Sequence, residues 1–275
     1  MAGKRVVLVG LGNSAVDIAD ELSHSGIARQ IYLSVRRGAW ILPKRILGRP
    51  IDQLSVTHPL VPWQVQSLLT RVILKLFTSA PPWRYGLPRP DHPPLGAHPT
   101  ISDHALEHLR EGRIVPKPAI SRLEGRRVRF ADGSAVEADV VLYCTGYRIS
   151  FPFFDPAFLS APDNDLPLWR RLLRPGEPDL FFVGLLQPLG AIMPLAEAQA
   201  RLIAACLAGE YALPDRQTMR GEMERERQQL AARYVRSDRH TMEVDFDRYL
   251  FELKREHRAG ERRARRTARP AADGA

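Results

Sequence analysis

The chain has 275 residues, of which 44% are hydrophobic and 26% are charged, and this composition is typical of a globular protein with a buried core and excludes wholesale disorder. Its two cysteines, Cys144 and Cys206, exclude a disulfide scaffold or a cysteine-rich zinc module and indicate a reducing, cytoplasmic setting. The net charge of +9 is uneven, because residues 254–275 contain eight Lys or Arg and three acidic residues. We interpret 253–275 as a basic, disordered tail, with nucleic-acid or anionic-membrane binding as the less favoured alternative.

The first 35 residues predict a βαβ unit. Residues 4–9 are mainly β-branched and aliphatic, which is typical of a buried parallel strand. Residues 14–24 have the apolar periodicity of an amphipathic helix, and residues 30–35 predict the next strand. No stretch of the chain approaches the 18 or more apolar residues that a membrane span requires.

Residues 40–100 predict an insertion of a different character. Residues 64–77 carry a complete apolar helical stripe, which we interpret as core, with a substrate tunnel or a membrane contact as alternatives. The stripe consists of Val65, Leu68, Leu69, Val72, Ile73, Leu76 and Phe77. Seven prolines between residues 81 and 99 then predict a long loop without regular structure.

The remaining elements are short strands followed by helices. A helix is expected to open at residues 100–103, which have a capping pattern, and to end at Gly112. Turn sequences at 124–125 and 132–133 predict hairpins, and residues 140–143 and 180–184 predict strands. A further helix is predicted from about Pro194, and the chain is charged and helical from about residue 216.

The most informative local motif is Gly10-Leu11-Gly12-Asn13-Ser14-Ala15, which has the form G-x-G-x-x-A. It lies between a predicted buried strand and an amphipathic helix, which is the context of a dinucleotide-binding turn. Gly10 permits the tight turn, Gly12 lets the backbone approach a pyrophosphate, and Ala15 keeps helix and strand close. The amides of the first helical turn would then bind the phosphates. A plain tight turn is the alternative.

The end of the second strand indicates which dinucleotide binds. An NAD site usually has an acidic residue there, whereas this strand ends Ser34-Val35-Arg36-Arg37. A guanidinium can bind a 2′-phosphate through two parallel charge-assisted hydrogen bonds. The two arginines therefore favour NADP(H), and arginines that are merely solvated are the alternative.

The sequence lacks the residues of a self-sufficient dehydrogenase. It has no Tyr-x-x-x-Lys pair of the short-chain dehydrogenase kind, and its eight histidines are scattered without metal-ligand spacing. We therefore predict no metal site and identify no catalytic residue. If the chain takes part in hydride transfer, the acceptor is expected to be a second cofactor.

Four segments, in order, resemble the flavin-containing monooxygenases. Residues 3–19 resemble the family's NADP-binding fingerprint, residues 34–40 its 2′-phosphate segment, Tyr143-Cys144-Thr145-Gly146-Tyr147 with residues 150–153 its A-T-G-Y motif, and residues 184–194 with Glu197, Gln199 and Arg201 the segment that closes over the flavin. The family usually has Ala where this chain has Cys144. Together the segments cover roughly residues 3–210.

The resemblance implies a site made of matching positions. The NADP(H) positions are Gly10, Gly12, Asn13, Ser14, Ala15, Asp17, Ser34, Arg36 and Arg37, and those near the flavin or the domain junction are Thr145, Gly146 and Gln187. The family also has an earlier G-x-G-x-x-G for FAD and an F-x-G-x-x-x-H signature, and this sequence contains neither. We therefore expect an N-terminally truncated member whose catalytic side chains lie mainly in the absent half.

The resemblance also implies an α/β fold and a two-cofactor reaction. We expect a Rossmann-type parallel-sheet NADP-binding domain over 3–147, with a helical and proline-rich insertion at about 40–100, and an incomplete FAD-binding domain with C-terminal helices over 148–252. NADPH would reduce FAD, and O₂ would then oxygenate a soft N, S or carbonyl substrate. The alternative is a non-catalytic NADP(H)-binding module or split-protein partner. The partners considered are the substrate, O₂, a second copy in a homo-oligomer or a chain that supplies the missing FAD half, but no nucleic acid.

Overall fold

The computed structural model describes residues 1–24, 27–46, 48–51, 61–77, 80–188, 190–233 and 242–267. The chain divides into two compact units, which are described separately below. The first unit comprises residues Met1–Leu54 and Gln64–Tyr147, and the second comprises Ser55–Trp63 and Arg148–Ala275. Among the described residues, no helix is long and apolar enough to cross a bilayer.

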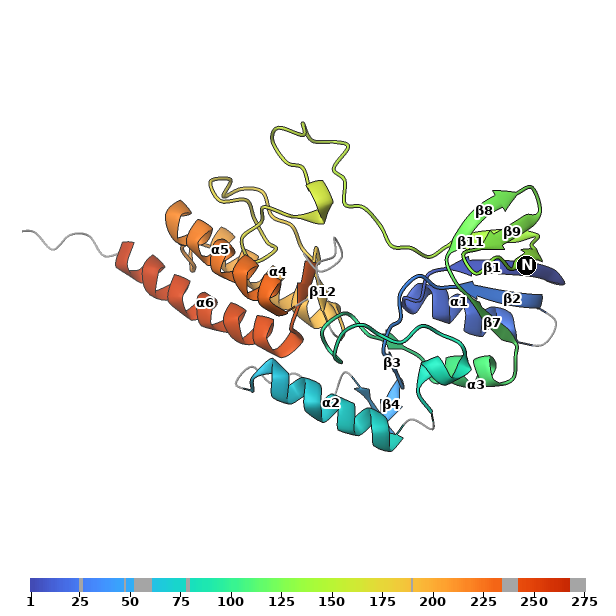
Figure 1. Cartoon of the computed structure of the whole chain (residues 1–275). Helices are drawn as coiled ribbons and strands as arrows, with labels where there is room; N and C mark the ends of the chain where they lie inside the picture. The colour runs from blue at the N-terminus through green and yellow to red at the C-terminus, as the bar shows by residue number, and fades with distance from the viewer. Residues whose placement is uncertain are drawn as a thin grey trace, which may run out of the picture. The chain divides into compact units, whose positions relative to one another are not determined.

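A four-stranded parallel sheet forms the centre of the first unit (Figure 1). Its order is β11-β1-β2-β7, with bounds Val140–Tyr143, Lys4–Val9, Ala28–Ser34 and Ile114–Lys117. Helix α1 (Asn13–Ser23) connects β1 to β2, and α3 (Ala105–Arg110) precedes β7. This arrangement confirms the predicted βαβ unit and its parallel sheet, with element bounds within two residues of those expected.

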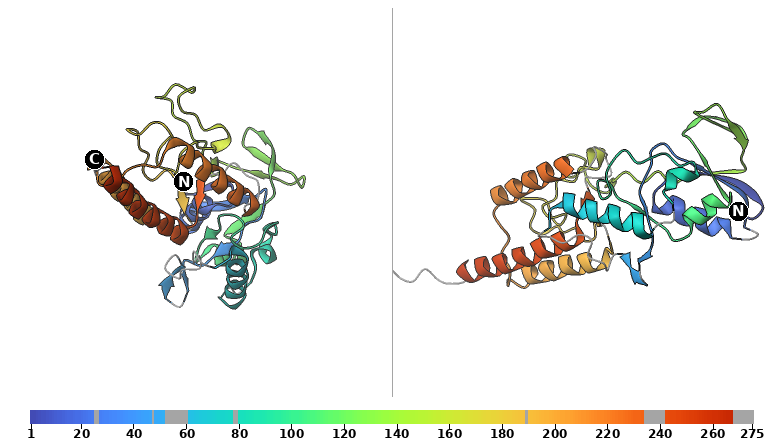
Figure 2. Two further views of the ribbon diagram at one scale, coloured as in Figure 1. Left: turned by 90° about the vertical axis from the view of Figure 1, so that its left-hand side faces the viewer. Right: turned by 60° about the horizontal axis from the view of Figure 1, so that its bottom comes forward.

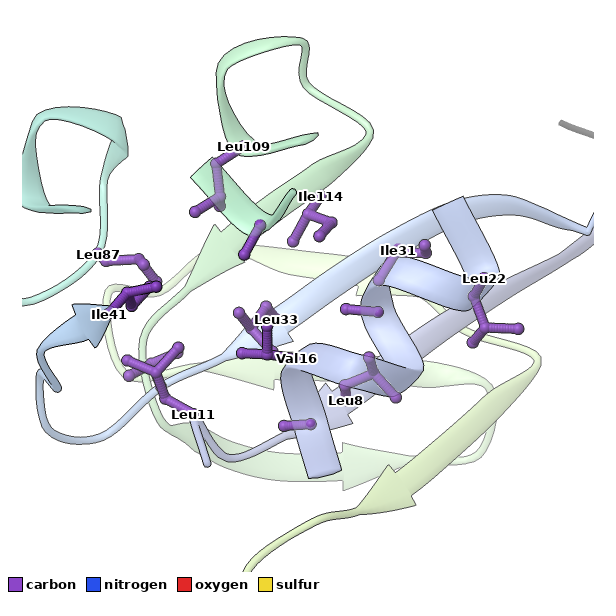
Figure 3. Close-up of a cluster of buried hydrophobic side chains, with 14 of the residues drawn as sticks. Leu8, Leu11, Val16, Leu22, Ile31, Leu33, Ile41, Leu87, Leu109 and Ile114 are labelled. Atoms are coloured by element: carbon purple, nitrogen blue, oxygen red, sulfur yellow. The ribbon is translucent and has the colours of Figure 1, made fainter. Parts of the chain in front are cut away.

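The two faces of this sheet are covered by different elements, because alternate residues of β1 point to opposite sides. Val6 and Leu8 pack with α1 and α3, and Figure 3 shows the α1 side chains meeting the strand side chains there. Val7 packs on the other face, against Val128 and Phe130 of an antiparallel meander. The meander consists of β8 (Ile120–Glu124), β9 (Arg127–Phe130) and β10 (Ala135–Glu137), joined at the two predicted turns.

Short strand pairs and one longer helix make up the insertion. Strand β3 (Ile41–Leu42) pairs in parallel with β6 (Thr100–Ile101), and β4 (Arg45–Ile46) pairs antiparallel with β5 (Arg49–Pro50). The proline-rich region has one 3₁₀ turn, η2 (Pro82–Tyr85), and no other helix or strand through residue 99. The predicted irregular loop is therefore confirmed apart from η2.

Helix α2 (Trp63–Phe77) forms where it was predicted, but the expectation that its apolar stripe is core is wrong. Five stripe residues are exposed, namely Val65, Leu68, Leu69, Val72 and Leu76. The buried face instead carries Gln66, Ser67, Thr70 and Leu74, and the Thr70 hydroxyl donates to the Gln66 carbonyl at 2.9 Å. Periodicity identifies residues that share a face of a helix, but it does not identify what that face packs against.

In the part that the structure describes, the second unit consists mainly of three long helices, with little sheet. Its elements are η3 (Pro162–Asn164), β12 (Gln187–Pro188), α4 (Met193–Leu207), α5 (Arg216–Arg233), β13 (Glu243–Val244) and α6 (Phe246–Thr267). Helices α4 and α6 pack side by side, as the right-hand view of Figure 2 shows. The main core of this unit includes Trp169, Leu172, Leu195, Leu202 and Leu253.

Two expectations for the second unit are corrected. Residues 180–184 are not a strand, because the segment opposite them is irregular and Phe181 forms only an isolated bridge with Leu173. Residues 253–267, expected to be a disordered tail, are helical, because Leu253, Glu256 and Gly260 of α6 are buried. Residues 268–275 lie outside the described part of the chain.

Candidate functional site

Three of the predicted segments meet at one edge of the parallel sheet. Residues 10–15 follow β1, residues 34–37 follow β2 and residues 145–146 follow β11, and these three strands are adjacent and parallel. From the central strand β1 the chain continues to β2 on one side, while β11 lies on the other. In open α/β sheets this point, beyond the carboxyl ends of the strands, is where ligands bind.

The glycine-rich turn after β1 is tightly packed. Gly10 has φ +127°, and a Cβ at this position would lie 2.5 Å from the Cys144 carbonyl oxygen. Its N–H donates to the Ser34 carbonyl at 3.0 Å, so it links the ends of two strands. Gly12, by contrast, has φ −81° and ψ 175°, an extended conformation that any residue can adopt. The backbone therefore requires glycine at Gly10 but not at Gly12.

The N-terminus of α1 has the features of an anion-binding site. The Val16 N–H donates to the Gly12 carbonyl at 3.1 Å, so the amides of residues 13–15 precede the first intrahelical bond. The first turn contains no acidic residue, and Ser14 is exposed while Ala15 is buried against the strand. Unbonded amides and the positive end of the helix dipole favour a phosphate here.

Asp17 lies one turn further along α1 and is exposed. Its Oδ1 atom is 3.3 Å from Lys44 Nζ. This ion pair offsets the negative charge that Asp17 would otherwise place near the phosphate-binding end of the helix.

The side chain of Asn13 anchors a neighbouring segment. Its Oδ1 accepts a hydrogen bond from the Ile101 N–H at 2.7 Å, and its Nδ2 lies 3.5 Å from His98 Nε2. The Thr100 hydroxyl donates to the Leu11 carbonyl at 2.5 Å. Residues 98–101 therefore support the glycine-rich turn. Sequence reasoning missed this role because it assigned residues 100–103 to a helix start, whereas Thr100–Ile101 is strand β6.

The two arginines after β2 are in different situations. Both are exposed, but the Arg37 guanidinium is 2.7 Å from Asp91 Oδ2, whereas Arg36 forms no ion pair with any described residue. Hydrogen bonds from His92 and Arg37 lower the pKa of Asp91 to about 2. Of these two described arginines, Arg36 is therefore the one available to an incoming phosphate. No sequence signal marked Asp91, which lies 54 residues from Arg37.

Ser34 contributes to the site through its backbone. Its side chain is buried, and its hydroxyl donates to the Pro118 carbonyl at 2.9 Å. The hydroxyl is thus already hydrogen-bonded to the chain that follows β7. Thr145 and Gly146, in contrast, are exposed just beyond Cys144, whose thiol has its pKa raised by burial.

Gln187 belongs to the second unit, where a buried hydrogen-bond chain fixes the segment that contains it. The Gly184 N–H donates to Gln199 Oε1 at 2.9 Å, and Gln199 Nε2 donates to the Tyr249 hydroxyl at 2.7 Å. That hydroxyl donates to the Arg170 carbonyl at 2.6 Å. Gln199 is fully buried, so this chain satisfies a polar side chain that would otherwise be costly to bury.

Within the described residues, no group of three or more His, Cys, Asp or Glu is arranged to hold a metal ion. Of the two histidines at the start of α3 and on it, His104 and His108, the second has a structural role. His108 is buried, and its Nε2 is 2.8 Å from Asp20 Oδ1 of α1.

Comparison with known proteins identifies the family. The sequence profile described as "Flavin-binding monooxygenase-like" matches residues 1–260. Flavin-containing monooxygenase 5 of Rattus norvegicus is 37% identical over 264 residues, which is 89% of this chain and 46% of the relative. Dimethylaniline monooxygenase [N-oxide-forming] 2 of the same organism is 33% identical over 262 residues, which is 91% of this chain and 48% of the relative. The chain thus spans about half the length of these relatives.

Solved structures share the fold. The S-allyl-L-cysteine S-oxygenase from Allium sativum superposes with a TM-score of 0.56 at 23% identity, covering 98% of this chain and 51% of the other. An oxidized steroid monooxygenase bound to NADP superposes with a TM-score of 0.59 at 14% identity, covering 94% and 66%. The α/β fold with a Rossmann-type parallel sheet is that of these oxygenases. By its sequence match over almost its whole length, the chain belongs to the flavin-binding monooxygenase-like family.

Proposed function

We propose that the first unit binds NADPH at the carboxyl edge of its parallel sheet. The observation that carries this proposal is the combination of an acid-free helix N-terminus with one unpaired arginine beyond the adjacent strand. The pyrophosphate would lie against the amides of residues 13–15, close to Gly12. Arg36 would hold the 2′-phosphate through charge-assisted hydrogen bonds.

Gly12 has a defined role in this arrangement. Its extended backbone does not need glycine, so the reason for glycine there is the space that a side chain would take from the phosphates. Asn13 would act by holding residues 98–101 against the glycine-rich turn. Arg37, at the margin of the proposed site, would be a positioning residue that is held by its ion pair with Asp91.

The proposal is tested by substituting Arg36 and titrating the 275-residue chain with both nucleotides. Arg36→Gln is expected to weaken NADPH binding about 30-fold, since about 2 kcal/mol of charge-assisted hydrogen bonding to the 2′-phosphate is lost. NADH affinity is expected to change less than twofold. Isothermal titration calorimetry measures both.

The matched control is Arg29→Gln. Arg29 is also an exposed arginine of β2, but it lies at the amino end of the strand, away from the proposed site. This variant should bind NADPH as the unsubstituted chain does. Equal losses for NADPH and NADH in the Arg36 variant would overturn the assignment of the 2′-phosphate to Arg36.

We further propose that the protein takes part in an FAD-, NADPH- and O₂-dependent monooxygenation. Supporting this, the names of relatives and neighbours include an N-oxide-forming monooxygenase, an S-oxygenase and a steroid monooxygenase bound to NADP. The proposed substrate is accordingly a soft nitrogen, sulfur or carbonyl compound. FAD would supply the oxygenation chemistry, while this chain's residues bind and orient NADPH.

Residues 184–188, which include Gln187, are the part of the second unit proposed to lie near FAD. The buried chain from Gly184 through Gln199 to Tyr249 would keep this segment in place without a ligand. These 275 residues contain one glycine-rich fingerprint, so we propose that further polypeptide completes the FAD site. A non-catalytic NADP(H)-binding role is the alternative for the chain by itself.

A visible absorption spectrum separates these two roles. The purified chain, mixed with FAD and passed through a desalting column, is expected to retain little flavin absorbance while still binding NADPH. Retention of one FAD per chain would contradict the need for further polypeptide and would favour a self-sufficient flavoenzyme.

A further inference from the structure

One face of α6 carries an uninterrupted group of cations. We define the basic face as Lys254, Arg255, Arg258, Arg262, Arg265 and Arg266, all of which are exposed. Residues 254, 258, 262 and 265 follow one another at helical spacings of three or four, so they form a single stripe, and the other two flank it. At 1.5 Å per residue the stripe is about 17 Å long.

The charge of the basic face is not neutralised by the described part of the protein. None of its six cations forms an ion pair with a described residue. Of the nearby acids of α6, Glu252 pairs with Arg248, and Glu261 Oε1 lies 3.9 Å from His257 Nε2, a contact that is an ion pair only when the histidine is protonated. Glu256 is buried and bonded to the Tyr211 hydroxyl at 2.9 Å. Six charges are therefore available to an external anionic partner.

The side of α6 opposite the basic face is packed against the rest of the second unit. Leu253 and Glu256 are buried, and a Cβ on Gly260 would lie 1.9 Å from the Tyr211 ring, so the backbone of α6 is in close contact with that ring. Arg263 Nε donates to the Ala212 carbonyl at 3.0 Å. The cations are thus presented on an ordered surface rather than on a flexible tail.

From this arrangement we infer that the basic face of α6 binds an anionic lipid surface. Clusters of four to eight Lys or Arg on an amphipathic helix are attracted to acidic headgroups. Phe251, which is 49% exposed, lies three residues before Lys254 on the same stripe and adds an apolar contact at the headgroup level. The arrangement combines regular charge with one aromatic side chain, as an interfacial helix does.

The geometry favours a flat surface over a nucleic-acid groove. A major groove is about 12 Å wide, which one helix fills by itself. A groove of that width contacts a helix on more than one side, whereas α6 packs against α4 (Figure 2) and presents its exposed side to a partner. A lipid surface imposes no such limit, since it contacts only the exposed side of α6.

The inference goes beyond the proposed nucleotide function and does not depend on it. The family profile ends at residue 260, so Arg262, Arg265 and Arg266 lie beyond the family match. The basic face belongs to the second unit, whereas the proposed nucleotide site belongs to the first. Loss of nucleotide binding should therefore leave lipid binding unchanged, and loss of lipid binding should leave nucleotide binding unchanged.

The test is co-sedimentation of the 275-residue chain with vesicles at 50 mM NaCl. One set of vesicles is phosphatidylcholine alone, and the other contains 30% phosphatidylserine. The chain is expected to bind the acidic vesicles at least tenfold more tightly, and 1 M NaCl should abolish the difference because the charges are then screened within about 3 Å.

The triple variant Arg258→Gln, Arg262→Gln, Arg265→Gln should bind acidic vesicles about 100-fold more weakly, at about fivefold per charge. The control triple variant Arg29→Gln, Arg127→Gln, Arg220→Gln removes the same net charge from exposed, scattered positions and should lose less than threefold. Circular dichroism and urea unfolding check that both variants remain folded.

Three results would overturn the inference. The first is no preference of the unsubstituted chain for acidic vesicles, and the second is an equal loss in both triple variants, which would reduce the effect to net charge. The third is tight binding of a 20-base-pair DNA duplex that the α6 variant alone loses, in the absence of vesicle binding. That outcome would assign the basic face to nucleic acid.

Discussion

Positive charge is arranged differently in the two units. At the sheet edge of the first unit, most charges are paired, Arg37 with Asp91 and Lys44 with Asp17, and Arg36 is left without an ion-pair partner among the described residues. On α6 of the second unit, six cations are repeated along one face, also without such partners.

The difference indicates two kinds of ligand. A single phosphate is recognised by one well-placed guanidinium and by backbone amides, and surplus charge there would reduce selectivity. An extended anionic surface requires no fixed geometry, so affinity grows with the number of charges. Net charge alone therefore says little about this chain, because its distribution between the two units carries the functional information.

Substitutions that create a cavity in the core of either unit are expected to have the largest effect on the free energy of unfolding. They also test whether the two units unfold independently. Leu8→Ala in the first unit and Leu202→Ala in the second each remove a fully buried side chain, and each should lower the free energy of unfolding by about 3 kcal/mol. Urea unfolding, followed by circular dichroism and by NADPH binding, measures both. Leu8→Ala should shift the loss of NADPH binding to lower urea, and Leu202→Ala should not; equal shifts in both variants would show one cooperative unit.

Substitution of Gly12 gives the next effect. Gly12→Val should weaken NADPH binding at least 100-fold, about 2.7 kcal/mol, because the side chain occupies the space of the pyrophosphate. The fold should persist, since φ −81° and ψ 175° suit valine. Calorimetry and circular dichroism measure the two properties. Unchanged affinity would mean that this turn has a purely structural role.

Gly10→Val is the companion variant and should behave differently. Position 10 has φ +127°, and an added Cβ would lie 2.5 Å from the Cys144 carbonyl oxygen, so valine is incompatible with this turn. We expect it to lose structure as well as binding, which separates the glycine needed by the backbone from the glycine needed by the ligand.

The smallest effect concerns Asp91 and pH. Its folded pKa of about 2 is below the ordinary value near 3.9, so its contribution to stability is present above about pH 4 and is lost as the pH falls toward 2. Because the pair is exposed to solvent, Asp91→Asn should cost only about 0.5 kcal/mol at pH 6. Thermal unfolding of both proteins from pH 6 to 2 should show this difference disappearing; a constant difference would exclude the Arg37 ion pair as its cause.

Sequence reasoning succeeded where local patterns determine the structure. The aliphatic run of β1, the periodicity of α1 and the turns of the meander each depend on residues close together in the chain. The position of residues 10–15 at the carboxyl end of β1 followed from these elements, because a turn between strand and helix has one place in a βαβ unit.

It failed where distant residues decide the outcome. The stripe of α2 and the face of α1 have the same periodicity, but one is exposed and the other buried, which depends on the surrounding elements. Likewise Arg36 and Arg37 are equivalent in sequence, and only the placement of Asp91 distinguishes them. Residues 253–267 of helix α6 were taken for part of a disordered tail because they are rich in arginine and alanine, whereas Tyr211 packs tightly against Gly260.

The most direct test of the account is calorimetric titration of the unsubstituted 275-residue chain with NADPH and with NADH. A site built on the α1 amides and Arg36 predicts that NADPH binds at one site per chain and at least tenfold more tightly than NADH. Absence of NADPH binding by the folded chain, or equal affinity for the two nucleotides, would contradict it.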